Sequence, residues 1–357
     1  MTGLISMRKA SRLLTTIPPG DLWAAVAALP KIELHRHLEG SLRLETLAEL
    51  TREHSLDMPG RDVEGLRPHV QVVGGPPGFS DYLGKFRLLR HFYLCQDVVM
   101  RLAYECVADT AQDNVKYMEL RFSPVALSTV QGFQVEQVID WVILATHQAQ
   151  RDHDIKVRLI AQIGRGEDVA VAWRVAEAAV AAHGSGLVGL DLAGNESAHS
   201  ATHFVDVFRW AAAHGLHITI HAGEAGPASN IRQAIEQAGA QRIGHGVRAG
   251  DDPAVMQLLI ERGVALEMCP TSNLHTGAVS ALSDHPLHRY QAAGMPVTIN
   301  TDNPSISNTT LTGEYRIAVC DLGITPSGLR QAIVQAATSA FLPETERRQL
   351  VAWFEQA

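Results

Sequence analysis

Apolar runs alternate with amphipathic stretches along most of the chain. Short runs rich in Val, Ile and Leu, bounded by Gly, Pro or polar residues, are typical of buried strands, and apolar residues recurring every three to four positions predict helices between them. The eight predicted strands span residues 31–35, 115–122, 155–163, 187–194, 216–220, 241–246, 264–268 and 297–302. Eight strands alternating with helices predict an α/β fold of the (β/α)8 or TIM barrel class.

The interval between the first two predicted strands is unusually long. It is mostly helical in pattern from Ser41 to Asp113, with a Gly/Pro-rich break at residues 74–78 and an apolar stripe that includes Tyr82, Leu83 and Phe86. Long connections in compact domains are often functional lids, although an aromatic stripe fits core packing equally well. The sequence therefore predicts extra helices inserted after strand 1, with a helical lid over about residues 60–113.

The domain organisation expected from this pattern is simple. Residues 1–20 end in Ile-Pro-Pro-Gly and predict an irregular N-terminal arm, and residues 21–357 predict a single barrel domain. With 357 residues, of which 46% are hydrophobic, the chain has enough apolar material for one large core.

Charge and cysteine content narrow the function classes. A formal net charge of -8 and the lack of any long Lys/Arg run argue against a nucleic-acid partner. The four cysteines have no CxxC spacing, which suits structural thiols in a reducing compartment. No apolar run approaches the roughly 18 residues of a membrane span, and the first twenty residues lack the apolar segment of a signal peptide. A cytoplasmic protein without a membrane partner is expected, and its oligomeric state is not predicted.

Polar side chains follow the predicted strands at the points where those strands end. They are His35 and His37 after the first strand, His221 and Glu224 after the fifth, His245 after the sixth, and Asp302 after the eighth. A single such histidine is more often a hydrogen-bonded core residue, but barrel active sites lie at the carboxyl ends of the strands, where all these residues fall. Three imidazoles and a carboxylate suit zinc or a neighbouring divalent transition metal. Glu224 can move a proton beside that metal without binding it.

Several separated motifs resemble the adenosine deaminase family of the metal-dependent amidohydrolase superfamily. The matching runs, in family order, are HRHLEG at 35–40, LDLAGNE at 190–196, HAGE at 221–224, GHG at 244–246, CPTSN at 269–273 and TDNP at 301–304. The resemblance implies one Zn²⁺ per chain, held by His35, His37, His221 and Asp302. It implies Glu224 as proton donor to purine N1, His245 as the group that orients and helps deprotonate water, Gly194 as a backbone contact to the purine, and Tyr82, Leu83 and Phe86 as an apolar lid.

Two positions depart from the usual family pattern. Glu39 stands where the family usually has an Asp that is implied to contact ribose, and Glu there also resembles adenine deaminases. The run at 270–277, however, looks more like the nucleoside enzymes. Asn303 stands where a second Asp contacts purine N7. Asn suits that role as a neutral donor to an acceptor, and the alternative is an Asn that only caps the turn before Pro304.

The resemblance implies zinc-dependent hydrolytic deamination of adenosine or 2′-deoxyadenosine to inosine or 2′-deoxyinosine plus ammonia, with a small purine nucleoside as substrate. Deamination of adenine or another 6-aminopurine nucleoside is the alternative, and an amidohydrolase of esters or lactams is a more distant one. A non-catalytic binding protein would be expected to have lost Glu224 or a ligand. Zinc deaminases of nucleic acids carry an H-x-E…P-C-x-x-C signature, which this chain lacks.

Overall fold

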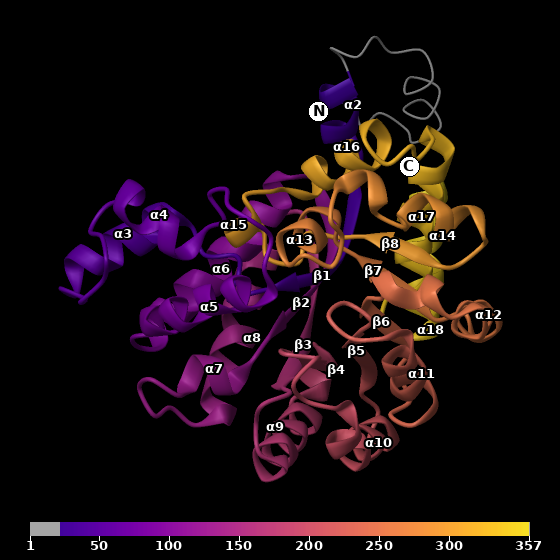
Figure 1. Cartoon of the computed structure of the whole chain (residues 1–357). Helices are drawn as coiled ribbons and strands as arrows, with labels where there is room; N and C mark the ends of the chain where they lie inside the picture. Colours follow the sequence, from indigo (N-terminus) through magenta and orange to yellow (C-terminus); the bar gives the residue numbers. More distant parts are fainter. Residues whose placement is uncertain (1–21, 357) are drawn as a thin grey trace.

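The computed structural model describes residues 22–356, so the predicted arm at residues 1–20 lies outside the described residues. Eight parallel strands pair in sequence order and form the barrel wall shown in Figure 1. They are β1 (Lys31–His37), β2 (Val115–Phe122), β3 (Lys156–Gly164), β4 (Leu187–Ala193), β5 (His217–Ala222), β6 (Arg242–His245), β7 (Ala265–Met268) and β8 (Val297–Ile299).

The segment that follows β8 meets β1 at an isolated bridge between Asp302 and Arg36 and nearly closes the ring. The Asp302 N–H donates to the carbonyl of His35 at 2.8 Å, and the His37 N–H donates to the carbonyl of Asp302 at 2.9 Å. The α/β (β/α)8 barrel is therefore confirmed, with the ends of β1 and β8 side by side. Because both ends carry predicted metal ligands, this closure brings residues 265 positions apart into contact range.

Helices surround the strands, as Figure 1 shows. Their bounds are α2 (Leu22–Ala28), α3 (Leu44–Glu53), α4 (Val63–Val70), α5 (Phe79–Leu89), α6 (Gln96–Gln112), α7 (Pro124–Ser128), α8 (Val135–Asp152), α9 (Val169–Ala181), α10 (Val205–Ala213), α11 (Ala228–Glu236), α12 (Pro253–Arg262), α13 (Pro270–His275), α14 (Leu287–Ala292), α15 (Pro304–Ser307), α16 (Leu311–Cys320), α17 (Pro326–Thr338) and α18 (Glu344–Gln356). None of the helices within residues 22–356 combines the length and apolar character needed to span a bilayer.

The predicted extra helices after β1 are α3, α4 and α5, and α3 and α4 project from one side of the barrel in Figure 1. The predicted lid segment at 60–113 contains helices α4, α5 and α6. Helix α6 packs against β2 and α8, as a helix of the outer ring does. Helix α5 instead supplies Tyr82, Leu83 and Phe86 to the wall of a pocket above the strands. Helix α5 therefore lies at the pocket, and a lid role for residues 60–113 stays a prediction.

Strand β8 is shorter than the predicted 297–302. The carboxylate of Glu33 accepts hydrogen bonds from the backbone N–H and the hydroxyl of Thr301, at 3.2 and 2.6 Å from Oε2, and so draws this segment toward β1. Asp302 then adopts a positive φ of 63°. These bonds to Glu33 take the place of a strand ladder at Thr301, and the Asp302 carboxylate lies beside the His35 and His37 rings.

Paired charges fill part of the barrel interior. Arg121 contacts Glu267 at 2.8 Å and Asp191 at 3.2 Å, and Arg242 contacts Glu267 and Glu119 at 2.5 Å each. All five side chains are at most 1% exposed. An unpaired buried charge is costly, so these residues depend on one another for their burial.

Candidate active site

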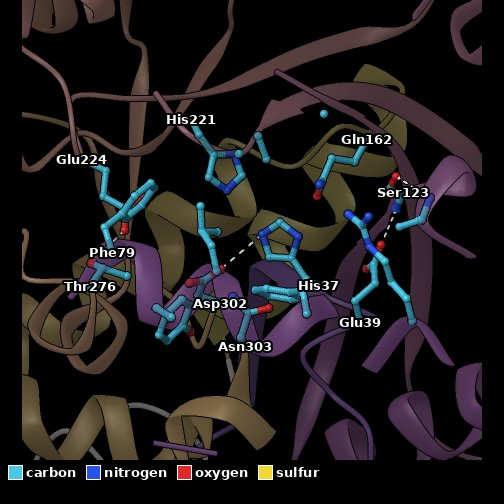
Figure 2. A pocket seen from close by; sticks show the side chains of 18 of the residues that line it. His37, Glu39, Phe79, Ser123, Gln162, His221, Glu224, Thr276, Asp302 and Asn303 are labelled. Atoms are coloured by element: carbon cyan, nitrogen blue, oxygen red, sulfur yellow. Dashed lines mark hydrogen bonds and ion pairs between the residues drawn. The ribbon is translucent and has the colours of Figure 1, made fainter. Parts of the chain in front are cut away.

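Four predicted ligands converge at the carboxyl ends of β1, β5 and β8. Each of His35, His37, His221 and Asp302 offers one ligand atom, and these atoms lie within 4.8 Å of one another. Figure 2 shows His37, His221 and Asp302 facing the same small volume. Residues i and i+2 of a strand share a face, which is why His35 and His37 both point there.

Buried carboxylates fix the orientation of two of these imidazoles. His35 Nδ1 lies 2.7 Å from Glu267, and His221 Nδ1 lies 3.1 Å from Asp191. Each ring therefore turns its Nε2 toward the cluster, as metal-ligating histidines do when a carboxylate holds the other nitrogen. Arg121 contacts both carboxylates and so couples the two rings.

The donor set fits a metal ion. The buried Nε2 of His35 has no hydrogen-bond partner among residues 22–356. The second oxygen of Asp302 accepts from the Ser272 hydroxyl at 2.5 Å, which leaves the first oxygen for the cluster. Three imidazole nitrogens and one carboxylate oxygen form the kind of set that zinc prefers.

Glu224 follows β5 in a loop that another carboxylate holds in place. Glu196 accepts hydrogen bonds from four successive backbone N–H groups of residues 223–226, at 2.7 to 3.0 Å. The Thr276 hydroxyl donates to Glu224 Oε1 at 3.0 Å. Burial raises the pKa of Glu224 to about 8. Glu224 is therefore a protonated acid at neutral pH, which is the state that a proton donor needs.

His245 lies at the end of β6 with a positive φ of 62° and is 1% exposed. The Asn273 amide nitrogen donates to His245 Nδ1 at 3.0 Å, and the Asn273 oxygen faces His285 Nε2 at 3.2 Å. Burial holds the pKa of His245 well below its usual value, so the ring is neutral. Since Nδ1 accepts a hydrogen bond, the proton of the neutral ring is on Nε2, 3.5 Å from Glu224 Oε2.

These groups open into one pocket, which the predicted substrate residues also line. Tyr82, Leu83 and Phe86 form an apolar wall, and Gly194, with a positive φ of 107°, lines the pocket with its backbone. Glu39 is 5% exposed, and one of its oxygens accepts from the Ser123 N–H at 2.6 Å.

Asn303 is 3% exposed and also lines this pocket. It precedes helix α15, but its side chain forms no capping hydrogen bond, and its amide oxygen has no partner within the described part of the chain. A Cβ on Gly40 would come within 2.0 Å of that oxygen, so Gly40 leaves the space that Asn303 occupies. The turn-cap interpretation therefore lacks the hydrogen bond that it requires.

The structure adds residues that the sequence did not predict. Glu196 and Thr276 lie within the quoted motifs, but their contacts to the Glu224 loop depend on the folded arrangement. The pocket is also lined by four residues outside the quoted motifs, namely Tyr93, Arg90, Gln162 near the end of β3 and Glu167 in the turn after β3. A polar residue near the end of a predicted strand was the only signal for Gln162, and no recognisable motif marks Glu167.

Comparisons with known proteins identify the family of this chain. The family model described as adenosine deaminase matches residues 30–356. The chain is 38% identical to an adenosine deaminase of Klebsiella pneumoniae (strain 342) over 331 residues, which cover 91% of this chain and 97% of that protein. It is 39% identical over 321 residues to the adenosine deaminase of Erwinia tasmaniensis, covering 89% of this chain and 96% of that protein.

Solved structures of related deaminases share the fold. The adenine deaminase of Arthrobacter aurescens superposes with a TM-score of 0.85 at 26% identity, covering 92% of this chain and 98% of that one. The N6-methyl-AMP deaminase of Arabidopsis thaliana gives a TM-score of 0.81 at 28% identity, covering 93% and 97%. On the family match over nearly the whole described chain, this protein belongs to the adenosine deaminase family.

Proposed function

We propose that this protein hydrolyses the 6-amino group of adenosine or 2′-deoxyadenosine, releasing ammonia and leaving inosine or 2′-deoxyinosine, with one Zn²⁺ per chain. The observation that carries the proposal is the placement of the buried Glu224 carboxyl, whose pKa burial raises to about 8, in one pocket with four converging metal-ligand side chains. The names of the similar bacterial proteins support adenosine as substrate. A purine nucleoside is accordingly the proposed small-molecule partner.

His35, His37, His221 and Asp302 would hold the metal. When bound, such an ion lowers the pKa of a coordinated water and so provides the nucleophile near neutral pH. Ser272 fixes the Asp302 carboxylate, while Glu267 and Asp191 fix the two imidazoles, so the ligand geometry is set before substrate arrives.

Glu224 would donate its proton to purine N1. Addition at C6 of an aromatic ring requires the adjacent ring nitrogen to take up a proton, and Glu224 holds one at neutral pH. His245 would present its Nε2–H to the attacking oxygen and orient it. In that tautomer the neutral ring is a donor at Nε2, so the structure favours the orienting role of His245 over the removal of a proton from water.

Adenine is the competing substrate, because Glu39 resembles adenine deaminases. Its second oxygen is buried without a partner in residues 22–356, which fits a contact to a ligand hydroxyl that adenine lacks. Adenosine and adenine should be compared by the loss of the adenine chromophore with purified, zinc-loaded protein. A higher kcat/KM for adenosine supports the proposal, whereas a higher kcat/KM for adenine, or no deamination of either, overturns it.

A further inference from the structure

His245 is held by a different kind of hydrogen bond from two of the predicted metal ligands. His35 and His221 each turn Nδ1 toward a carboxylate, which accepts the Nδ1 proton and leaves Nε2 free to bind a metal. His245 instead turns Nδ1 toward the side-chain amide of Asn273, 3.0 Å away. The direction of this one hydrogen bond decides whether His245 Nε2 carries a proton.

The surroundings of Asn273 fix the orientation of its amide. Asn273 is 0% exposed, and its oxygen lies 3.4 Å from the backbone nitrogen of Cys269. A backbone N–H can only donate, so the Asn273 atom that faces it is the amide oxygen. The amide nitrogen then faces His245 Nδ1 and donates to it, which leaves the proton of the neutral ring on Nε2.

His285 requires the same orientation from the other side of the amide. The backbone N–H of Leu287 donates to His285 Nδ1 at 3.3 Å. Burial lowers the pKa of His285 to about 4, so its ring is neutral and its single proton is on Nε2, 3.2 Å from the Asn273 oxygen. A reversed amide would set donor against donor at both His285 Nε2 and the Cys269 N–H. Two backbone N–H groups therefore fix the direction of the whole series of hydrogen bonds.

This direction also separates His245 from the metal ligands. The ligand atoms of His35, His245 and Cys269 lie within 4.8 Å of one another and make a second possible ligand set. A ring nitrogen that carries a proton has no free lone pair for a metal ion, and Nδ1 of His245 is already occupied by Asn273. His245 is thus kept out of metal binding, although its ring centroid lies 4.7 Å from that of His35.

We propose that Asn273 and His285 are positioning residues that hold His245 as the tautomer with its proton on Nε2, so that His245 donates to the attacking oxygen and does not bind the metal. Neither residue lines the pocket, whereas His245 does, so both act through His245. The inference rests on the proposed function for the identity of the group that receives the Nε2–H, while the tautomer itself does not depend on that function.

The direct test is nitrogen NMR of zinc-loaded protein labelled at its histidine rings, because protonated and unprotonated ring nitrogens resonate far apart. The signals of His245 are those missing from His245→Gln. The wild type should show an unprotonated Nδ1 and a protonated Nε2. Asn273→Asp should place a proton on Nδ1, since a carboxylate accepts there while still accepting from Cys269 and His285. A proton on Nδ1 in the wild type, or none on Nδ1 in Asn273→Asp, overturns the proposal.

Adenosine kinetics test whether the tautomer matters for turnover. In Asn273→Asp, kcat should fall by about 10²- to 10⁴-fold, as for a catalytic imidazole held in the wrong tautomer, while KM changes little. His285→Met removes the donor to Asn273 and should lower kcat by about 2- to 10-fold, the share of one hydrogen bond. His285→Gln keeps a donor near the former Nε2 position and should restore most of that loss.

His288→Gln is the matched control, because it removes an exposed histidine of α14. It should leave the His245 signals and the kinetics unchanged, and circular dichroism and zinc content check that every variant is folded and loaded. Equal losses in His285→Met and His285→Gln overturn the positioning role of His285.

Two outcomes separate this inference from the proposed function. Wild-type kcat in Asn273→Asp, with the His245 proton on Nδ1 alone, overturns the donor role of His245 and leaves deamination intact. No deamination by the wild type overturns the proposed function, and the NMR comparison then decides the tautomer without any activity.

Discussion

Burial raises the pKa of Glu224, while hydrogen bonds from its loop to Glu196 and from the Thr276 hydroxyl fix its position. Replacing it with Gln keeps nearly the same shape and the Thr276 contact but removes the transferable proton. Glu224→Gln should therefore bind metal and melt like the wild type, while kcat falls by about 10²- to 10⁴-fold, the usual share of general acid catalysis. Turnover close to that of the wild type would place the acid elsewhere.

The pH dependence follows from the same residue. Burial raises the pKa of Glu224 to about 8, so the carboxyl is protonated below that pH and ionised above it. Since the acid form is the active one, kcat/KM should decline as pH rises through the pKa of Glu224. A divalent cation nearby favours the ionised form, so the decline should begin at or below pH 8. A kcat/KM that rises across pH 7 to 9 contradicts the assignment.

Asn303 offers a second test of a single residue. Purine N7 is an acceptor, and an Asn amide is a donor at any working pH, so 7-deazaadenosine should react about 10- to 100-fold more slowly than adenosine. Asn303→Ala should lose most of this discrimination. If the wild type treats the two nucleosides alike, Asn303 has no role at N7.

At the scale of elements, side chains from three strands hold two imidazoles of the predicted metal site in place. Arg121 of β2 joins Asp191 of β4 to Glu267 of β7, and these two carboxylates orient His221 and His35. Arg121→Met would leave both carboxylates buried without this cation. Chemical denaturation should show a loss of about 3–5 kcal/mol in the free energy of unfolding, the usual cost of breaking a buried pair from one side.

The matched control is Arg174→Met, which removes an exposed pair with Glu136 on the outer helices. That variant should unfold nearly like the wild type, because exposed ion pairs are screened by solvent. Equal stability of the two variants would mean that Arg121 does not carry the interior charge network.

The order and the ends of the strands could be predicted, because the apolar runs that form buried strands can be recognised in short stretches of sequence. All eight predicted strands exist. The end of β8 could not be predicted, because Thr301 hydrogen-bonds to the Glu33 carboxylate, 268 positions earlier in the chain, instead of continuing the strand. Likewise, Glu196 reaches the site through the loop after β4, whose path depends on packing. The ligand atoms of His35, His37, His221 and Asp302 lie within 4.8 Å of one another, whereas the groups that hold these side chains in place could be recognised only in the folded chain.

At the scale of the whole molecule, one barrel rim gathers ligands, acid and substrate pocket, and the account depends on a single metal held there. The most direct measurement is a zinc titration of chelator-treated, metal-free protein, with adenosine deamination recorded at each addition. Turnover should be absent at the start, rise linearly and level off at one zinc per chain. His221→Ala should show no such rise, and His214→Ala, at an exposed site, should match the wild type. Full turnover in the metal-free protein, or an unchanged titration in His221→Ala, would contradict the account.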